Sequence, residues 1–369
     1  YGHVKTETGF ALNQSSVSSK RKSSDKLDFV RQKSSRTVNM DLDSNSPACI
    51  FATLVAGSAL KLLGGYLTAK NEVTVYRPVG RVASLYVYPI KSFRGIQVEQ
   101  GDCTALGLSC FGVTDRHWAV ATPDGVYLTQ RQEPTMALIS VQVKGDIMQL
   151  EAPGMEPITL PVNPPVTADR LSKITVKTDT LTSLDCGDEV ASWLCRYFKR
   201  SGLRLHFSAP SLEKRHCEKN KKNWNHPAQP GDLTALSDYC GYMMLSNPSL
   251  AALNQKLNSP VPISNFRANF IVDGCSAFEE DNFAFVRIGN AELRALDSCT
   301  RCVLVTVDQD RGVKDPKEEP LATLKKFRLK EPYGPKPTFG VNFTLDKPGK
   351  IKVGDTIYAM KGQHQVSPK

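Results

Sequence analysis

The sequence lacks the short motifs that identify several large classes of enzyme and binding protein. No glycine-rich phosphate loop of either common type is present, which disfavours nicotinamide-dependent and nucleoside-triphosphate-dependent folds. No zinc-finger spacing, aromatic-basic RNA motif or basic helix is present, so we expect no nucleic-acid partner. Internal repeats and flavin, haem and iron–sulfur motifs are also missing. Any redox chemistry on this chain would therefore need electrons from another protein.

Closely spaced cysteines are almost absent, although the chain contains ten cysteines. The ten are scattered and follow no cleavable signal peptide, which indicates free thiols in a reducing compartment. Only Cys299 and Cys302, in the stretch DSCTRCVLVTVDQDRG, have the spacing of metal ligands or of a redox dithiol.

Charge is concentrated at the start of the chain. Of the net charge of +10, half comes from residues 1–39, which hold eight basic and three acidic residues. The rest is mildly basic, which suits an anionic cofactor or an acidic protein partner. At 369 residues and 40% hydrophobic content, the chain is long enough for one large or two ordinary domains.

The first 47 residues read as a disordered, basic, serine-rich tail. We interpret Met40 as the natural start, so that the residues before it would not belong to the native protein. A basic, serine-rich transit peptide is the alternative.

Residues 48–69 form an apolar run whose only charge is Lys61, long enough to cross a bilayer as one helix. Acidic residues precede this run and basic residues follow it, which predicts an anchor with the remaining chain in the cytosol. A buried helix or the apolar part of a signal peptide are the alternatives.

From Arg81 onward, short alternating strands and turns predict a β-rich α+β fold, barrel-like, with few helices. Hairpins are expected to turn at Pro123–Gly125 and at Gly289–Asn290. Apolar spacing predicts helices over 187–202, capped by Gly202, and over 248–257. We also expect a strand over 301–308 and an exposed loop over 217–232.

The two cysteines of CTRC allow several interpretations. Zinc needs about four ligands, and the only other adjacent pair is His216 and Cys217, whose side chains would point apart. A thioredoxin-like dithiol needs a helix N-terminus, whereas a strand is expected after Cys302. Two buried packing residues are the simplest alternative. Arg301 favours a different role, because a cation beside a thiol can stabilise a thiolate and attract an anion.

Six motifs then occur in the order found in MOSC-domain proteins: YPIKSFRG, TDRHW, TQRQEP, NFRANFIV, CTRCVLVTVD and GKIKVGDTIY. Over residues 81–360 the chain resembles this family, and within it the mitochondrial amidoxime-reducing components of animals. The resemblance implies an α+β, β-rich fold. An N-terminal β-rich MOSC domain (81–207) would precede a MOSC-type β-barrel (208–361) and a tail (362–369), with 48–69 as the single anchor helix.

The resemblance also implies a molybdenum enzyme that carries molybdopterin, with Cys302 as a catalytic ligand to the metal and Asp238 as an acid beside it. The other residues that would contact the cofactor are Lys91, Ser92, Arg116, Tyr239, Cys240, Arg267, Asn269, Arg301 and Asn342. Tyr239 and Cys240 depart from the family, which commonly has small hydroxyl residues there. Asn342 stands where the family often has tyrosine.

The implied activity is the reduction of N-hydroxylated compounds, a detoxification reaction on amidoximes, N-hydroxyguanidines and hydroxylamines, with nitrite as a further candidate. Electrons would come from NADH through cytochrome b5 reductase and cytochrome b5. The implied location is the mitochondrial outer membrane facing the cytosol, with the peroxisomal membrane as an alternative. A non-catalytic molybdenum-cofactor carrier is the alternative function.

Overall fold

The structure, a computed structural model, describes residues 75–218, 228–331 and 333–362. The predicted N-terminal tail (1–47) and anchor (48–69) lie outside this range, as does all of the predicted C-terminal tail (362–369) except residue 362. Among the described residues, no helix is both long and apolar enough to cross a membrane.

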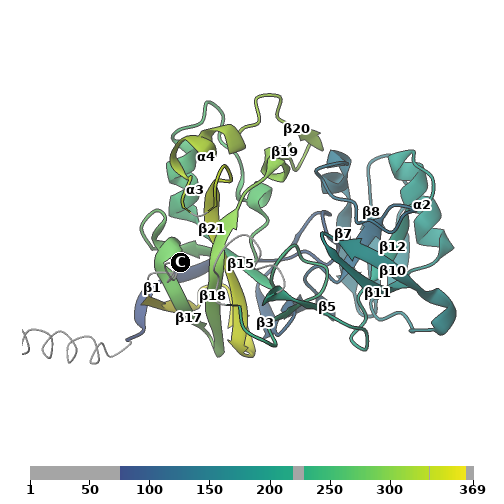
Figure 1. Cartoon of the computed structure of the whole chain (residues 1–369), viewed down its shortest axis with the longest axis horizontal. Coiled ribbons are helices and arrows are strands. Elements are labelled where there is room, and N and C mark those ends of the chain that lie inside the picture. The colour runs from purple at the N-terminus through teal and green to yellow at the C-terminus, as the bar shows by residue number, and fades with distance from the viewer. Residues whose placement is uncertain (1–74, 219–227, 332, 363–369) are drawn as a thin grey trace, which may run out of the picture. The chain divides into compact units, whose positions relative to one another are not determined.

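A closed β-barrel forms the larger part of the fold (Figure 1). Its strands follow the order β16–β15–β21–β18–β17–β23–β1, and β1 also pairs with β16, which closes the ring. The pairs are antiparallel except for β15 with β16. Their bounds are β1 Arg77–Val87, β15 Tyr242–Ser246, β16 Phe270–Asp273, β17 Phe283–Ile288, β18 Ala291–Thr300, β21 Thr338–Lys347 and β23 Thr356–Lys361.

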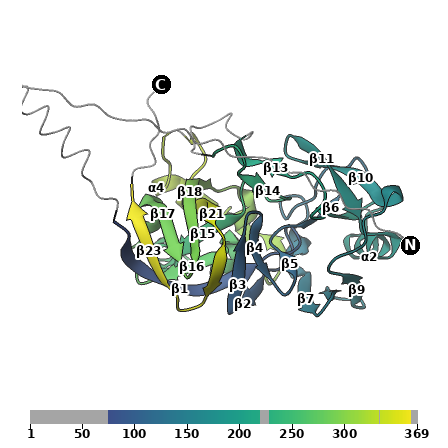
Figure 2. The same ribbon diagram turned by 90° about the horizontal axis from the view of Figure 1, so that it is seen from below.

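Smaller sheets pack beside the barrel, and Figure 2 shows them from below. A four-stranded sheet contains β10 (Leu171–Val176), β11 (Asp179–Asp185), β12 (Arg204–Phe207) and β6 (Trp118–Ala121). A second contains β22 (Gly349–Lys352), β3 (Gln100–Thr104), β4 (Gly107–Cys110) and β5 (Val113–Thr114). A third contains β7 (Ser140–Lys144), β8 (Ile147–Glu151) and β9 (Ile158–Pro161). The remaining strands are β2 (Ile96–Val98) on β1, the pair β13 (Arg215–His216) and β14 (Leu233–Thr234), and the pair β19 (Val307–Asp308) and β20 (Val313–Lys314). The prediction of a β-rich α+β fold is thus confirmed, as are both hairpin turns.

Three α-helices lie in the described chain: α2 (Asp188–Phe198), α3 (Asn247–Asn254) and α4 (Leu321–Phe327). Helix α2 buries Val190, Trp193 and Leu194, the face that its apolar spacing predicts. It ends earlier than expected, because Lys199 takes the left-handed conformation, so the prediction of a Gly202 cap is wrong. Helix α3 also ends sooner than predicted, and α4 was not predicted.

One further local prediction is wrong. The segment after Cys302 is a 3-10 helix (Val303–Thr306), and only Val307 and Asp308 continue as a strand.

The loop predicted over 217–232 is described only at its ends, because residues 219–227 lie outside the described range. Residues 229–231 are exposed, as predicted. Cys217 is fully buried, and Asp232 is buried and forms an ion pair with Arg294 at 3.0 Å.

One buried carboxylate joins three separate parts of the chain. Oδ1 of Asp115 accepts hydrogen bonds from the backbone N–H of Tyr88 (2.8 Å) and from the amide of Asn269 (2.9 Å). Its Oδ2 accepts from the guanidinium of Arg116. The Asn269 amide bonds in turn to Tyr86 O and to the N–H of Met243. The end of β1 and the starts of β6 and β16 are therefore held by one charge.

We predict that Asp115→Asn lowers the free energy of unfolding by about 3–5 kcal/mol, because an amide leaves the partly buried Arg116 without its fully buried counter-charge. Urea unfolding followed by circular dichroism measures the change. Asp102→Asn is the matched control, since this exposed carboxylate lies 3.8 Å from Lys350 and should contribute less than about 1 kcal/mol. Equal effects of the two substitutions would contradict this role for Asp115.

Candidate functional site

A cavity of about 460 Å³ lies where the barrel meets the smaller sheets. All eleven residues that the sequence singled out line it: Lys91, Ser92, Arg116, Asp238, Tyr239, Cys240, Arg267, Asn269, Arg301, Cys302 and Asn342. They come from both predicted domains and from strand ends and loops that are distant in sequence. The structure therefore brings the predicted set together, while the role of each residue stays a prediction.

Several wall residues have an unusual backbone conformation. In the described chain, eight non-glycine residues have positive φ, and four of them line the cavity: Ser92 (69°), Arg116 (52°), Lys177 (57°) and Arg267 (54°). Left-handed backbone is costly for residues with a side chain, and such strain tends to cluster at functional sites. Here it directs basic and hydroxyl side chains from loops into the cavity.

Two arginines of the cavity wall contact the buried aromatic ring of Tyr88 behind them. The guanidinium carbons of Arg116 and Arg267 lie 4.8 and 4.3 Å from the centre of the Tyr88 ring. Arg116 donates to the backbone oxygen of Arg267 (3.0 Å). Nη2 of Arg267 is buried and has no hydrogen-bond partner among the described residues, and burial lowers the pKa of Arg267 to about 10. Ser237 also lines the cavity, and its buried hydroxyl has no hydrogen-bond partner in the part of the chain that the structure describes. These donors suit an anionic, oxygen-bearing ligand.

Lys91 and Asp238 form an ion pair on the cavity wall. Nζ of Lys91 lies 2.6 Å from Oδ1 of Asp238 and also donates to Leu236 O at 2.8 Å. Burial would raise the pKa of Asp238, but the charges of Lys91, Lys177 and Arg131 together hold it well below its usual range. Burial lowers the pKa of Lys91 to about 8, although Asp238 opposes this. At neutral pH Asp238 is therefore a carboxylate, and the proton of the pair is held at Lys91 Nζ.

The CTRC stretch spans the end of β18 and the turn after it. Cys302 is exposed at the cavity, whereas Cys299 is partly buried and packs on the apolar cluster around Phe339. A single 3-10 turn follows Cys302, so the α-helix dipole of a thioredoxin-like site is missing. A thioredoxin-like dithiol is therefore still disfavoured. The reason is the short 3-10 turn after Cys302, and not the strand that the sequence predicted there. All nine described cysteines are free thiols.

Arg301 is turned into the protein. Its Nε and Nη2 donate to Phe339 O at 2.8 and 2.6 Å, and its Nη1 donates to Phe266 O at 3.0 Å. Gly340 leaves room for this arrangement, since a Cβ there, at φ +78°, would lie 2.4 Å from Met243 Cε. Arg301 therefore contributes charge to the cavity while its donors hold β18 against β21.

The two residues that depart from the family lie in the cavity wall. Cys240 is buried with Cys217 and Leu296, and Tyr239 packs against this small apolar cluster. Asn342 on β21 faces Met243 on β15 and Asp297 on β18 in the sheet register. At positions 239 and 240, a larger and a less polar side chain thus stand where the family resemblance predicts small hydroxyl residues.

Comparison with known proteins agrees with the motifs. A model described as the MOSC N-terminal beta barrel domain matches residues 79–201, and a model of the MOSC domain matches residues 233–358. The chain is 39% identical over 287 residues to mitochondrial amidoxime reducing component 2 of Bos taurus, which covers 76% of this chain and 84% of the relative. The chain belongs to the MOSC-domain family.

Other relatives carry similar names. The MOSC chain is 38% identical over 318 residues to mitochondrial amidoxime-reducing component 1 of Homo sapiens, covering 85% of this chain and 92% of the relative. With component 1 of Mus musculus it shares 39% identity, over 76% of this chain and 83% of the relative. Among solved structures, the YUAD protein of Bacillus subtilis has a TM-score of 0.35 and 12% identity, covering 78% of this chain and all of that one. That structural likeness is too low to add to the assignment.

Sequence reasoning missed several residues of the cavity wall in this MOSC protein. Thr129 lies inside the quoted TQRQEP motif, so the motif itself could have pointed to it. Lys177 stands in the tight turn between β10 and β11, and its position carries no local signal. Asp297 lies two residues before Cys299, outside the CTRCVLVTVD motif, and its position carries no local signal of a place in the cavity wall.

We predict that Lys91 titrates near pH 8 and that Asp238→Asn moves its midpoint lower, because the carboxylate is the main group that opposes the effect of burial. A ¹³C NMR titration of isotopically labelled lysines measures both midpoints. Asp102→Asn, on an exposed carboxylate, should leave the Lys91 midpoint in place. A midpoint that rises in Asp238→Asn would show that the pair does not carry the charges described.

Proposed function

We propose that this MOSC protein is a molybdenum-cofactor-dependent reductase of N-hydroxylated compounds such as amidoximes, N-hydroxyguanidines and hydroxylamines, and also of nitrite. The observation that carries the proposal is the gathering of eleven predicted residues on one cavity, with a single exposed cysteine among them. The names of relatives that are 38–39% identical over most of the chain support the same activity.

The residues present fit molybdopterin. Its phosphate and thiolates need cations and N–H donors, and the cavity offers Lys91, Arg116 and the unpartnered Nη2 of Arg267. Its metal needs a soft protein ligand, and the exposed thiol of Cys302 is of that kind. Ser92, Asn269, Tyr239, Cys240, Arg301 and Asn342 would complete the contacts with the cofactor. When bound, the cofactor supplies the two electrons that break the N–O bond.

The protein's own part in the reaction is to position charge and a proton. The ion pair of Lys91 and Asp238 holds a proton at Lys91 Nζ, 2.6 Å from the carboxylate, beside the cavity. The departing oxygen needs protons to leave as water. We therefore assign proton supply to the Lys91–Asp238 pair, rather than to Asp238 alone as the family resemblance implies. Nη2 of Arg131 lies 3.8 Å from Oδ2, the other oxygen of the Asp238 carboxylate.

The electron donor in this proposal is cytochrome b5, reduced by NADH through cytochrome b5 reductase. The relatives are mitochondrial by name, which supports a mitochondrial location. We place the protein on the outer membrane, facing the cytosol, through residues 48–69, with the peroxisomal membrane as the alternative. The division into domains 81–207 and 208–361 belongs to the same proposal.

We predict that the full chain, mixed with cytochrome b5, its reductase and NADH, reduces benzamidoxime to benzamidine. Chromatography of the product measures the rate, and omission of cytochrome b5 should stop the reaction. A chain that contains molybdenum yet shows no turnover would favour the alternative function as a cofactor carrier.

The two cysteines should behave differently. Cys302→Ala should lose activity to the background level while its thermal unfolding stays near that of the wild type, because the exposed thiol contributes little packing. Cys299→Ala is the matched control and should keep most of its activity, since this side chain packs against apolar neighbours. Equal loss in both variants would indicate a dithiol or a shared metal pair instead.

A further inference from the structure

Three aspartates lie in or beside the cavity wall, and their surroundings differ. Asp115 is fully buried, and Arg116, Tyr88 N and Asn269 satisfy it. Asp238 is paired with Lys91. Asp297 lines the cavity and is 6% exposed, yet no basic side chain of the described chain forms an ion pair with it. A buried carboxylate needs hydrogen-bond donors or a cation around it. Of the three, Asp297 is the one that lacks a cationic partner among the described residues.

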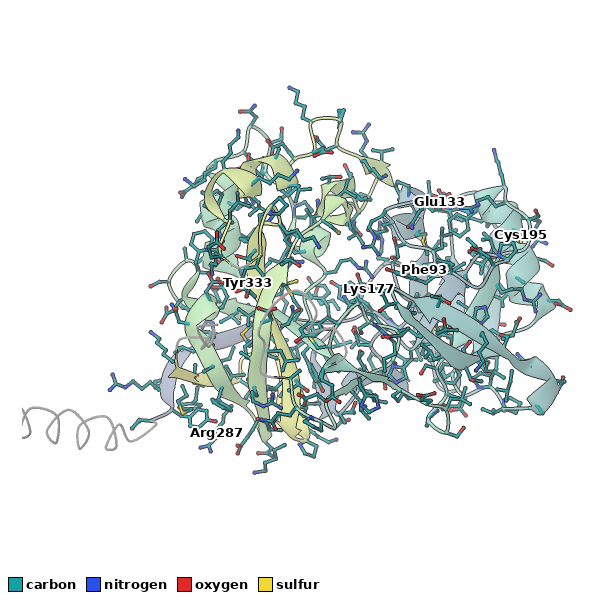
Figure 3. The ribbon with its side chains drawn as sticks, viewed as in Figure 1. Phe93, Glu133, Lys177, Cys195, Arg287 and Tyr333 are labelled. Atoms are coloured by element: carbon teal, nitrogen blue, oxygen red, sulfur yellow. The ribbon has the colours of Figure 1, made fainter. Side chains whose placement is uncertain are left out.

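Asp297 is held in place by its neighbours. It lies on β18, opposite Asn342 on β21, and both side chains line the cavity. The hydroxyl of Tyr333 donates to its Oδ1. Figure 3 labels Tyr333 beside the ribbons of the barrel and Lys177 beside those of the smaller sheets. The carboxylate is therefore fixed rather than free to turn toward solvent.

The other titratable groups near Asp297 do not neutralise it. Tyr239 comes from the loop before β15, Cys299 from the same strand and Tyr333 from the segment before β21, and Lys336 lines the same cavity. Burial raises the pKa of Asp297 to about 6, although the Tyr333 hydroxyl and the Ser298 N–H oppose this. At neutral pH the carboxylate is mostly ionised, and each of its oxygens can accept more than one hydrogen bond.

We propose that Asp297 binds the 2-amino-4-oxopyrimidine edge of a pterin, accepting the ring N3–H and the 2-amino group with its two oxygens. A carboxylate is well suited to two parallel N–H donors. The ligand would then have an anionic end, held by Lys91, Arg116 and Arg267, and an end rich in N–H groups, held by Asp297. The inference rests on the proposed function in taking the ligand to be a pterin.

The test uses two pteridines that differ only at this edge. Pterin presents two donors there, whereas lumazine has a carbonyl in place of the 2-amino group and so presents one donor and one acceptor. Full-length protein from cells that cannot make molybdopterin is titrated with each compound, and the quenching of pteridine fluorescence is followed. Wild type should bind pterin at least about tenfold more tightly than lumazine, since a carboxylate facing a carbonyl is unfavourable.

Asp297→Asn should reverse or abolish this preference, because an amide offers one acceptor and one donor that match lumazine. Asp102→Asn is the matched control, because this exposed side chain of β3 is not in the cavity lining, and it should leave the preference unchanged. Tyr333→Phe keeps the carboxylate but removes its anchor, so it should weaken the preference without reversing it. If Asp297→Asn does not fold, wild type and Tyr333→Phe still decide the question.

Equal affinity of wild type for the two pteridines, binding of neither, or an unchanged preference in Asp297→Asn would overturn the inference. Benzamidoxime reduction reports separately on the proposed function. An active reductase that does not discriminate between pteridines overturns only the role of Asp297, whereas an inactive chain that discriminates overturns only the reductase proposal.

Discussion

The buried carboxylate of Asp115 holds together the parts of the chain on which the cavity depends. It binds the backbone after β1 and two side chains, Arg116 and Asn269, that line the cavity themselves. Arg116 then reaches the backbone of Arg267, so one negative charge fixes two cavity cations that could otherwise repel each other. A cavity that gathers positive charge from several loops needs an internal counter-charge of this kind, because unpaired buried cations are strongly unfavourable.

The charged groups around the cavity are of two kinds: those with a partner in the protein and those without one in the described chain. Lys91 and Arg116 each have a carboxylate partner. Among the residues that the structure describes, Arg267 keeps a buried N–H without a hydrogen-bond partner, and Asp297 forms no ion pair with a basic side chain. Such incomplete groups are costly in the absence of a ligand and favourable with it. We regard them as the places where a bipolar ligand, anionic at one end and rich in N–H groups at the other, completes the hydrogen bonding of the fold.

Local patterns predicted the β-rich class, both hairpins and the buried face of α2, because these depend on neighbouring residues. The strand expected after Cys302 failed, since Val305 and Thr306 are buried in a tight turn and packing overrode their β-propensity. The cavity residues could be chosen only through the ordered family motifs, because nothing in the sequence near Lys91 indicates that Arg267 lies on the same cavity. Lys177 and Asp297 lie outside those motifs. Lys177 stands in the local turn between β10 and β11, and Asp297 reaches the cavity through the pairing of β18 with the distant strand β21.

The central claim is that this cavity holds a molybdenum–pterin cofactor through Cys302. Joint analysis of metal and pterin in the purified full-length wild type and Cys302→Ala tests it most directly. The account predicts molybdenum and pterin in equal amounts in the wild type, and loss of molybdenum in Cys302→Ala. Zinc without molybdenum, or molybdenum unchanged in Cys302→Ala, would contradict it.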